Sequence, residues 1–139
     1  MIAEMTPADY DEVFALWSRT EGMGLGVSDT RERIGEFLAR NPGMCFVARD
    51  GGAIVGTVLC GTDGRRGYLH HLAVAPGHRR RGIGSALVQH CMAALKQWNI
   101  PRCHLFVLPT NEAAMAFYGR LGWRCAEDRG AKVMSCDVV

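Results

Sequence analysis

Hydrophobic and polar positions alternate along this chain with a period that changes several times. Residues 1–5 predict a short strand, and Pro7 then takes the first position of a helix whose apolar stripe ends at Trp17. A glycine-rich break follows. The next apolar stripe has helical spacing again, so we expect a second helix that begins at Asp29 or Thr30 and ends at the sequence NPG.

Strand-like patterns dominate the middle of the chain. The segments MCFVARD and AIVGTVLCG flank a Gly-Gly turn and predict a β-hairpin. YLHHLAVA predicts a fourth strand and CHLFVL a fifth, which Pro109 ends. The last segment, RCAEDRGAKVMSCDVV, predicts two closing strands around Arg129 and Gly130. Seven strands are therefore expected.

Two more helices lie between and after these strands. Ile83, Leu87, Cys91, Leu95 and Trp98 stand at helical spacing, and NEAAMAFYGRLGW predicts a shorter helix that a glycine stops. Neither a repeat nor a linker interrupts the pattern. We therefore expect one α/β domain over residues 1–139, with four helices and a mixed, mostly antiparallel twisted sheet of about seven strands.

Composition and charge narrow the function classes. The chain is 48% hydrophobic and 22% charged, which is typical of a globular protein, and its net charge of +2 disfavours a general nucleic-acid binder. No apolar segment reaches the ~18 residues that a membrane span needs, and no signal peptide is visible. The six cysteines form no Cys-x-x-Cys or zinc-type cluster, so we expect buried free thiols, no metal and a cytoplasmic protein.

The segment HLAVAPGHRRRGIGSALV carries the densest positive charge and two glycines at a strand-to-helix junction. The first amides of a helix lack internal partners, and the helix dipole makes that end partly positive. Residues 79–85 are therefore predicted to bind a pyrophosphate or a similar anion. The patterns of P-loops and of Rossmann dinucleotide sites are both absent. Two alternatives for this basic segment stay open: a solvated turn without a ligand, and a patch that binds nucleic acid.

Two motifs in this chain resemble the signatures of the GNAT superfamily of acyl-CoA N-acyltransferases. The first is Arg79-x-x-Gly82-x-Gly84 after the strand sequence LAV, and the second is NEAAMAFYGRLGW. The resemblance implies acetyl-CoA as cosubstrate and a sheet splayed between its fourth and fifth strands. It also implies cofactor contacts from the fourth strand, from the basic loop and from the start of the last helix: Leu72, Ala73, Val74, Arg79, Arg80, Arg81, Gly82, Ile83, Gly84, Ser85 and Asn111.

Acetyl transfer to an amine needs a proton acceptor, an oxyanion donor and an acid for the departing thiolate, because an alkylammonium has a pKa near ~10.4. A strand amide between Leu72 and Val74 is the candidate oxyanion donor. The resemblance places the Tyr118 hydroxyl near the thioester sulfur, as the acid. The alternative is an ordinary core tyrosine.

His70 is the first candidate for the base, because the unperturbed pKa of histidine lies near neutrality. Its place two residues before LAV resembles that of a proton-pathway histidine in arylalkylamine acetyltransferases. Strict alternation puts Tyr68, His70 and Leu72 on one face and Leu69, His71 and Ala73 on the other. His71 is the second candidate for the base, if a bulge reverses the alternation. A water chain from Tyr68 is the third candidate. A merely structural His70 also stays open.

The acceptor is not specified by the sequence. By resemblance, residues 20–30 and a hairpin at 127–131 flank the acceptor side. Phe106 stands where ribosomal-protein alanine acetyltransferases have a functional Glu, which disfavours protein N-terminal acetylation. A small amine, an amino acid, an aminoglycoside and a protein amine stay open. Homodimers are common in the family, and a non-catalytic acyl-CoA-binding sensor is the competing interpretation.

Overall fold

The computed structural model describes residues 1–126 and 130–138. The chain divides into two compact units, Met1–Phe106 and Val107–Val139. The first unit holds the sheet and three of the four α-helices, and the second unit holds the last α-helix.

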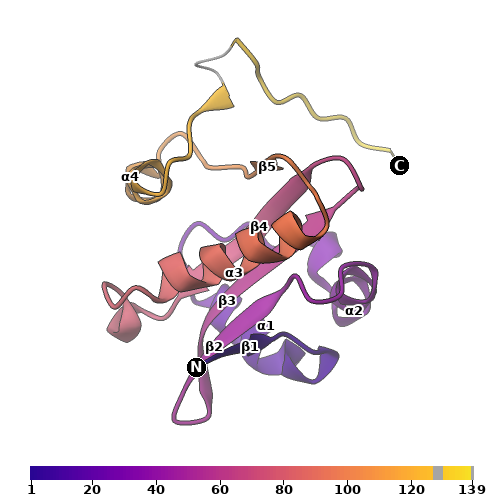
Figure 1. The fold of residues 1–139 in the computed structure, drawn as a ribbon. Helices are drawn as coiled ribbons and strands as arrows, with labels where there is room; N and C mark the ends of the chain where they lie inside the picture. Colours follow the sequence, from indigo (N-terminus) through magenta and orange to yellow (C-terminus); the bar gives the residue numbers. More distant parts are fainter. Residues whose placement is uncertain (127–129, 139) are drawn as a thin grey trace. The chain divides into compact units, whose positions relative to one another are not determined.

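One mixed sheet forms the centre of the first unit (Figure 1). Its five strands lie in the order β1-β2-β3-β4-β5, with the first four antiparallel and β5 parallel to β4. Gly51 and Gly52 both have positive φ in the turn of the predicted hairpin, which suits glycine and closes β2 onto β3. The strands are β1 (Ile2–Glu4), β2 (Phe46–Asp50), β3 (Ala53–Thr62), β4 (Gly67–Val74) and β5 (Cys103–His104).

The helices of the first unit begin close to where the sequence predicts. Thr30 caps α2 by accepting a hydrogen bond from the Arg33 amide at 3.2 Å. The expected first helix is split into a 3-10 turn and an α-helix. These elements are η1 (Pro7–Asp9), α1 (Tyr10–Ser18), η2 (Val27–Asp29), α2 (Arg31–Arg40), η3 (Pro76–His78) and α3 (Ile83–Gln97). Among the described residues, no helix is long and apolar enough to cross a membrane.

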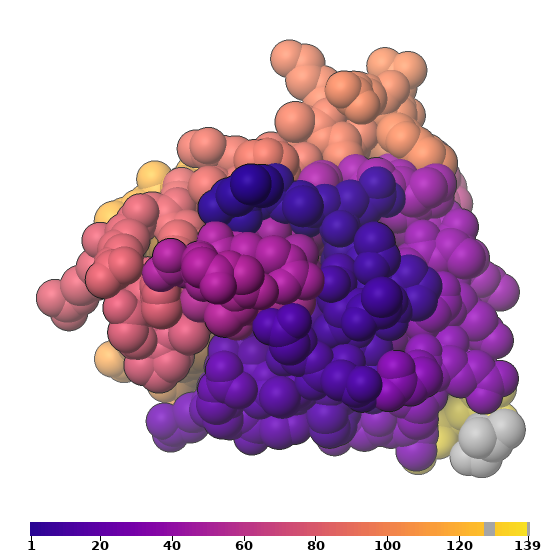
Figure 2. All heavy atoms as spheres, turned by 90° about the horizontal axis from the view of Figure 1, so that it is seen from below, coloured from indigo at the N-terminus to yellow at the C-terminus, as the bar shows by residue number. Residues whose placement is uncertain are grey.

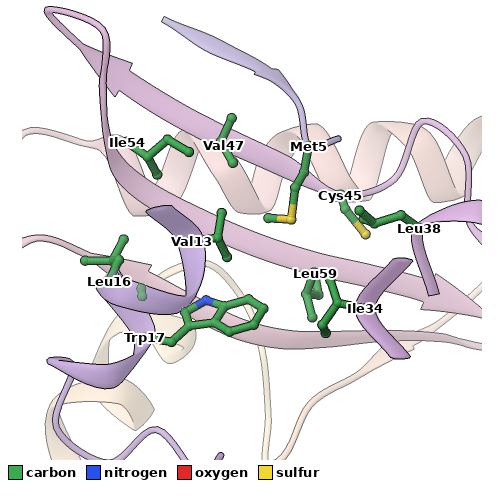
Figure 3. Close-up of a cluster of buried hydrophobic side chains, with 11 residues drawn as sticks. Met5, Val13, Leu16, Trp17, Ile34, Leu38, Cys45, Val47, Ile54 and Leu59 are labelled. Atoms are coloured by element: carbon green, nitrogen blue, oxygen red, sulfur yellow. The ribbon is translucent and has the colours of Figure 1, made fainter. Parts of the chain in front are cut away.

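The helices cover both faces of the sheet. A Cβ added to Gly61 would lie 2.7 Å from the Phe37 ring of α2, whereas one added to Gly56 would lie 3.0 Å from Ile83 of α3. Because neighbouring strand positions alternate between faces, α2 and α3 pack on opposite sides. Figure 3 shows the buried cluster between the sheet and the helices α1 and α2, which includes the fully buried Trp17 of α1.

The prediction of seven strands is wrong: the sheet has five. The expected fifth strand over residues 103–108 is reduced to Cys103–His104. The two closing strands do not form in the described residues 124–126 and 130–138, and Arg129 lies outside the described part of the chain. Strands need partners for their backbone groups, which an apolar pattern alone does not provide.

The second unit contains α4 (Glu112–Arg120). The Asn111 side chain caps this helix by accepting a hydrogen bond from the Ala114 amide at 3.1 Å. Gly122, with φ of 93°, follows the helix end, as the sequence predicts. The four expected α-helices are thus confirmed.

The six cysteines are free and differ in burial. Cys45, Cys60 and Cys91 are buried, Cys103 is half-buried, and Cys125 and Cys136 are exposed. Burial raises the pKa of the Cys45 thiol to about 12, which keeps this group protonated and unreactive. The prediction of buried thiols is therefore confirmed for the three sheet and α3 cysteines and wrong for the last two, which follow the sheet.

Candidate functional site

A β-bulge interrupts β4 at His71 and Leu72. Leu59 of β3 pairs with His70 and Thr57 pairs with Ala73, so two residues of β4 lie opposite Val58 alone. His71 has φ of 51°, in the left-handed region that few residues other than glycine adopt. The bulge shifts the alternation of the strand by one position.

Both histidines consequently lie on the face that α1 and α2 cover. The His70 ring contacts the ring of Phe37 in α2, at a centroid distance of 6.0 Å. The His71 ring meets Trp17 of α1 edge-on at 4.7 Å. The strict alternation expected from the sequence is wrong beyond His70, since Ala73 also belongs to the buried cluster on this face.

A cavity of about 430 Å³ opens beside the two histidines, entirely within the first unit. Its wall includes Asp29 and Ser28, so the predicted acceptor segment 20–30 does line it. The residues around it are Gly24, Ser28, Asp29, Arg33, Ile34, Glu36, Phe37, Arg40, Leu59, His70 and His71. It combines an apolar wall with acidic, basic and imidazole groups, which is typical of a small-molecule site.

Asp29 is the acidic residue nearest to His71. Its Oδ1 lies 2.7 Å from Nε2 of His71, and its side chain is 10% exposed. Oδ2 accepts a hydrogen bond from the Gly26 amide at 2.9 Å, and the Asp29 carbonyl accepts one from the Tyr10 hydroxyl at 2.6 Å. The sequence marked Asp29 only as one acid of a loop, because the pairing joins residues 42 positions apart.

Buried hydrogen bonds hold the backbone of the bulge. The Trp17 indole Nε1 donates to the Thr57 hydroxyl at 2.9 Å, and that hydroxyl donates to the His71 carbonyl at 3.1 Å. Trp17 and Thr57 are both 0% exposed. The connection from α1 through β3 to β4 therefore fixes the histidine's backbone, which compensates for its unfavourable φ.

His70 has a different environment. Burial, and then the charge of His71, lower the pKa of His70 below its ordinary value. A buried histidine with a lowered pKa is neutral at neutral pH and is a weak proton acceptor.

Charged side chains of α2 surround the other end of the cavity. Arg33 and Glu36 form an exposed ion pair at 3.6 Å, and Arg40 lies at the end of the same helix. The sequence predicts the helix that carries these side chains. Their position beside the histidines depends on how α2 packs on the sheet.

The basic loop leads into α3 as predicted. Gly82, with φ of 79°, is the N-cap of α3, and Arg80 also has positive φ, 64°. Within the described part of the chain, no side chain caps the amides of the first turn, Ile83 to Ser85. Arg80 and Arg81 are exposed, and the segment around residue 80 (salmon) protrudes beside the β2–β3 turn (magenta) (Figure 2). An anion therefore has access to amide groups and guanidinium groups together.

Arg79 is placed differently from the two arginines that follow it. Its Nε donates to the Val74 carbonyl at 3.0 Å, which ties the loop to the end of β4. The rest of its guanidinium keeps donors for another acceptor.

The predicted cofactor strand is an edge over most of its length. β4 pairs with β5 at Gly67 and Tyr68 only, and beyond them no described strand pairs with this side of β4. Leu72, Ala73 and Val74 lie on that stretch, so their outward backbone groups suit pairing with an extended ligand.

Two predicted site residues, Asn111 and Tyr118, belong to the second unit. The Asn111 side chain is the α4 cap described above. The Tyr118 ring contacts Phe117 at 5.0 Å and Trp123 at 5.5 Å, both edge-on, so α4 and the residues after it hold the ring within this unit.

Comparison with known proteins identifies the family of this chain. The sequence model of the acetyltransferase (GNAT) family matches residues 10–123. An acetyltransferase of Pectobacterium atrosepticum is 33% identical over 119 residues, which are 86% of this chain and 84% of the relative. The chain therefore belongs to the GNAT acetyltransferase family.

Solved structures show the same fold. Ard1 from Thermoplasma volcanium superposes with a TM-score of 0.78 at 24% identity, over 88% of this chain and 80% of its own. The PaiA N-acetyltransferase from Thermoplasma acidophilum, solved in complex with coenzyme A, superposes with a TM-score of 0.75 at 16% identity, over 87% of each chain. At these identities the likeness concerns the fold.

Proposed function

We propose that this chain is an N-acetyltransferase that moves an acetyl group from acetyl-CoA to a primary amine, by direct attack in a ternary complex and as one domain over residues 1–139. The observation that carries the proposal is the cavity beside β4, where two histidines of the strand expected to bind the cofactor meet Asp29 of η2. An open cavity whose apolar wall carries acidic, basic and imidazole groups favours an enzyme over the alternative of a non-catalytic acyl-CoA sensor, for which a closed cleft is expected.

The cofactor-binding part of the proposal rests on two features of the chain. The uncapped start of α3, with Arg80, Arg81 and Gly82, suits the pyrophosphate, and Ile83, Gly84 and Ser85 supply its amides. The unpaired edge from Leu72 to Val74 suits the pantetheine arm. A splay between β4 and β5 at this point is part of the proposal. Arg79 and Asn111 complete the proposed set. When bound, acetyl-CoA supplies the acetyl group on a thioester, whose C–S bond breaks.

Proton transfer is assigned to side chains of the protein. A histidine of β4, His70 or His71, takes the proton that the ammonium must lose before its nitrogen attacks. A backbone amide between Leu72 and Val74 stabilises the developing oxyanion. The Tyr118 hydroxyl gives a proton to the departing sulfur and regains one from the nitrogen that has become an amide. The reaction then yields an acetylated amine, free coenzyme A and one proton.

The acceptor in this proposal is a small-molecule or protein amine. The residues that would meet it come from the segment 20–30 and from α2, because these supply most of the cavity wall. We include a homodimer in the proposal because homodimers are common in the family. Neither a nucleic acid nor a membrane is a proposed partner.

The first test is acetyl-CoA consumption with a panel of primary amines, peptides and aminoglycosides, followed by mass spectrometry of the products. We expect one acceptor class to gain about 42 mass units, because an acetyl group replaces one hydrogen on the nitrogen. Tyr118→Phe then lowers kcat by about 10²-fold or more and leaves coenzyme A binding unchanged. Binding of acetyl-CoA without transfer to any amine supports the sensor instead. No binding of acetyl-CoA refutes both.

A further inference from the structure

Building on the proposed function, we infer that His71 is the proton acceptor and that Asp29 is the positioning residue that orients it. The sequence favoured His70, so this inference changes the assignment of the base. It rests on the hydrogen bond between the two side chains, on the anchoring of both residues and on the contrast with His70.

The Asp29 carboxylate is itself held in place. The Gly26 amide donates to its second oxygen, and the Tyr10 hydroxyl binds its backbone carbonyl, so η2 cannot rotate without breaking both bonds. Only 8% of the residue is exposed. A buried carboxylate that accepts two directed hydrogen bonds orients its partner more rigidly than an exposed ion pair does.

The hydrogen bond determines which nitrogen of His71 carries the proton. An ionised carboxylate only accepts, so Nε2 of His71 must donate, at 2.7 Å. The neutral ring then has its lone pair on Nδ1, and no hydrogen bond from another described residue reaches that atom. The lone pair at Nδ1 is thus available for the proton of an ammonium acceptor, and the Asp29 carboxylate faces the imidazolium that forms.

Several contacts hold the backbone of His71 in an unfavourable conformation. A left-handed conformation at a residue other than glycine costs about 1–3 kcal/mol and persists where surrounding contacts require it. Here the Thr57 hydroxyl holds the carbonyl and Trp17 contacts the ring edge. Without the bulge, His71 would face α3 and would be unable to reach Asp29.

His70 lacks these features. Its ring packs on Phe37, and no described carboxylate bonds to it. Burial and then the neighbouring His71 lower the pKa of His70, and the charge of Asp29 offsets them only in part. The remaining charged groups of the cavity are Arg33, Glu36 and Arg40 of α2, which lie with Asp29 around the same space.

The experiment compares Asp29→Asn with Asp50→Asn, a matched control. Asp50 accepts from His78 Nε2 at 2.8 Å, a His–Asp hydrogen bond of nearly the same length outside the cavity. Long-range ¹H–¹⁵N spectra report the tautomer of each histidine. We expect His71 of the wild type to carry its proton on Nε2, and Asp29→Asn, but not Asp50→Asn, to abolish that preference. A wild-type His71 with its proton on Nδ1 overturns the inference without any variant.

Kinetics with the acceptor found in the panel give the second readout. We expect Asp29→Asn to lower kcat about tenfold or more with little change in the KM of the amine, and Asp29→Glu to recover part of the loss. His71→Asn lowers kcat about 10²-fold or more, and His70→Asn lowers it less. A larger loss in His70→Asn, or an unchanged kcat in Asp29→Asn, contradicts the assignment.

The two proposals fail in distinguishable ways. If no amine is acetylated, the proposed function and the base role of His71 both fail, while the tautomer still reports whether Asp29 positions the ring. If transfer occurs and the tautomer is unaffected by Asp29→Asn, the positioning role alone fails.

Discussion

Replacing Thr57 by valine tests whether the buried hydroxyl holds the histidine bulge. Valine has almost the shape of threonine but no hydroxyl, so the substitution removes the acceptor of the Trp17 indole and the donor of the His71 carbonyl. All three groups belong to the side of the sheet that carries the cavity. The change therefore affects both stability and the site.

The magnitude follows from the burial of these groups. An indole N–H left without an acceptor in a fully buried side chain costs about 1–3 kcal/mol, and loss of the bond to the carbonyl costs about 1 kcal/mol. We expect Thr57→Val to lower the free energy of unfolding by about 2–4 kcal/mol. That is a large part of the roughly 5–15 kcal/mol typical of a domain.

Urea unfolding followed by circular dichroism and tryptophan fluorescence measures this loss. Thr57→Ser is the control, because it keeps the hydroxyl and removes one methyl group, at a cost of about 1 kcal/mol. In the Trp17→Phe background, Thr57→Val is expected to cost less, since no indole N–H is left unsatisfied. A valine variant as stable as the wild type, or more stable than the serine variant, refutes the reasoning.

Three further predictions concern other parts of the chain. Gly82→Ala is expected to lower the free energy of unfolding by about 1–2 kcal/mol, because Gly82 has a φ of 79°, and to weaken coenzyme A binding. Gly77 has no positive φ, so the control Gly77→Ala is expected to change neither quantity. Equal effects of the two substitutions in a calorimetric titration of coenzyme A contradict this prediction. The pKa of His70 is lowered by burial, so the unfolded chain takes up the proton first below about pH 6.5, and stability falls as the pH falls. His70→Asn reduces that slope in urea titrations, and an unchanged slope is the contrary result. In native protein treated with a thiol reagent, peptide mass spectrometry is expected to find Cys125 and Cys136 modified long before Cys45, and equal rates at the three cysteines contradict this.

The sequence by itself determined most of the local structure. The caps Thr30 and Asn111, the Gly-Gly turn and the apolar stripes act over a few residues, so the strands up to β4 and the four α-helices were predictable. The 3-10 turn η2 was not predicted. The same holds for the basic loop, because a positive φ at Gly82 and an uncapped helix start follow from the local order of glycines. The family resemblance rested on these local motifs.

Only the tertiary structure decided where the two histidines lie. Period-2 alternation sends His70 and His71 to opposite faces, whereas the bulge against Val58 brings both to one face. Asp29 meets His71 across 42 positions, and the Thr57 hydroxyl reaches the same residue from β3. Such contacts depend on how helices and strands pack, and no spacing within a single element encodes them. The predicted strands after β4 differ from the observed structure for the same reason, because a strand forms only where another part of the chain pairs with it.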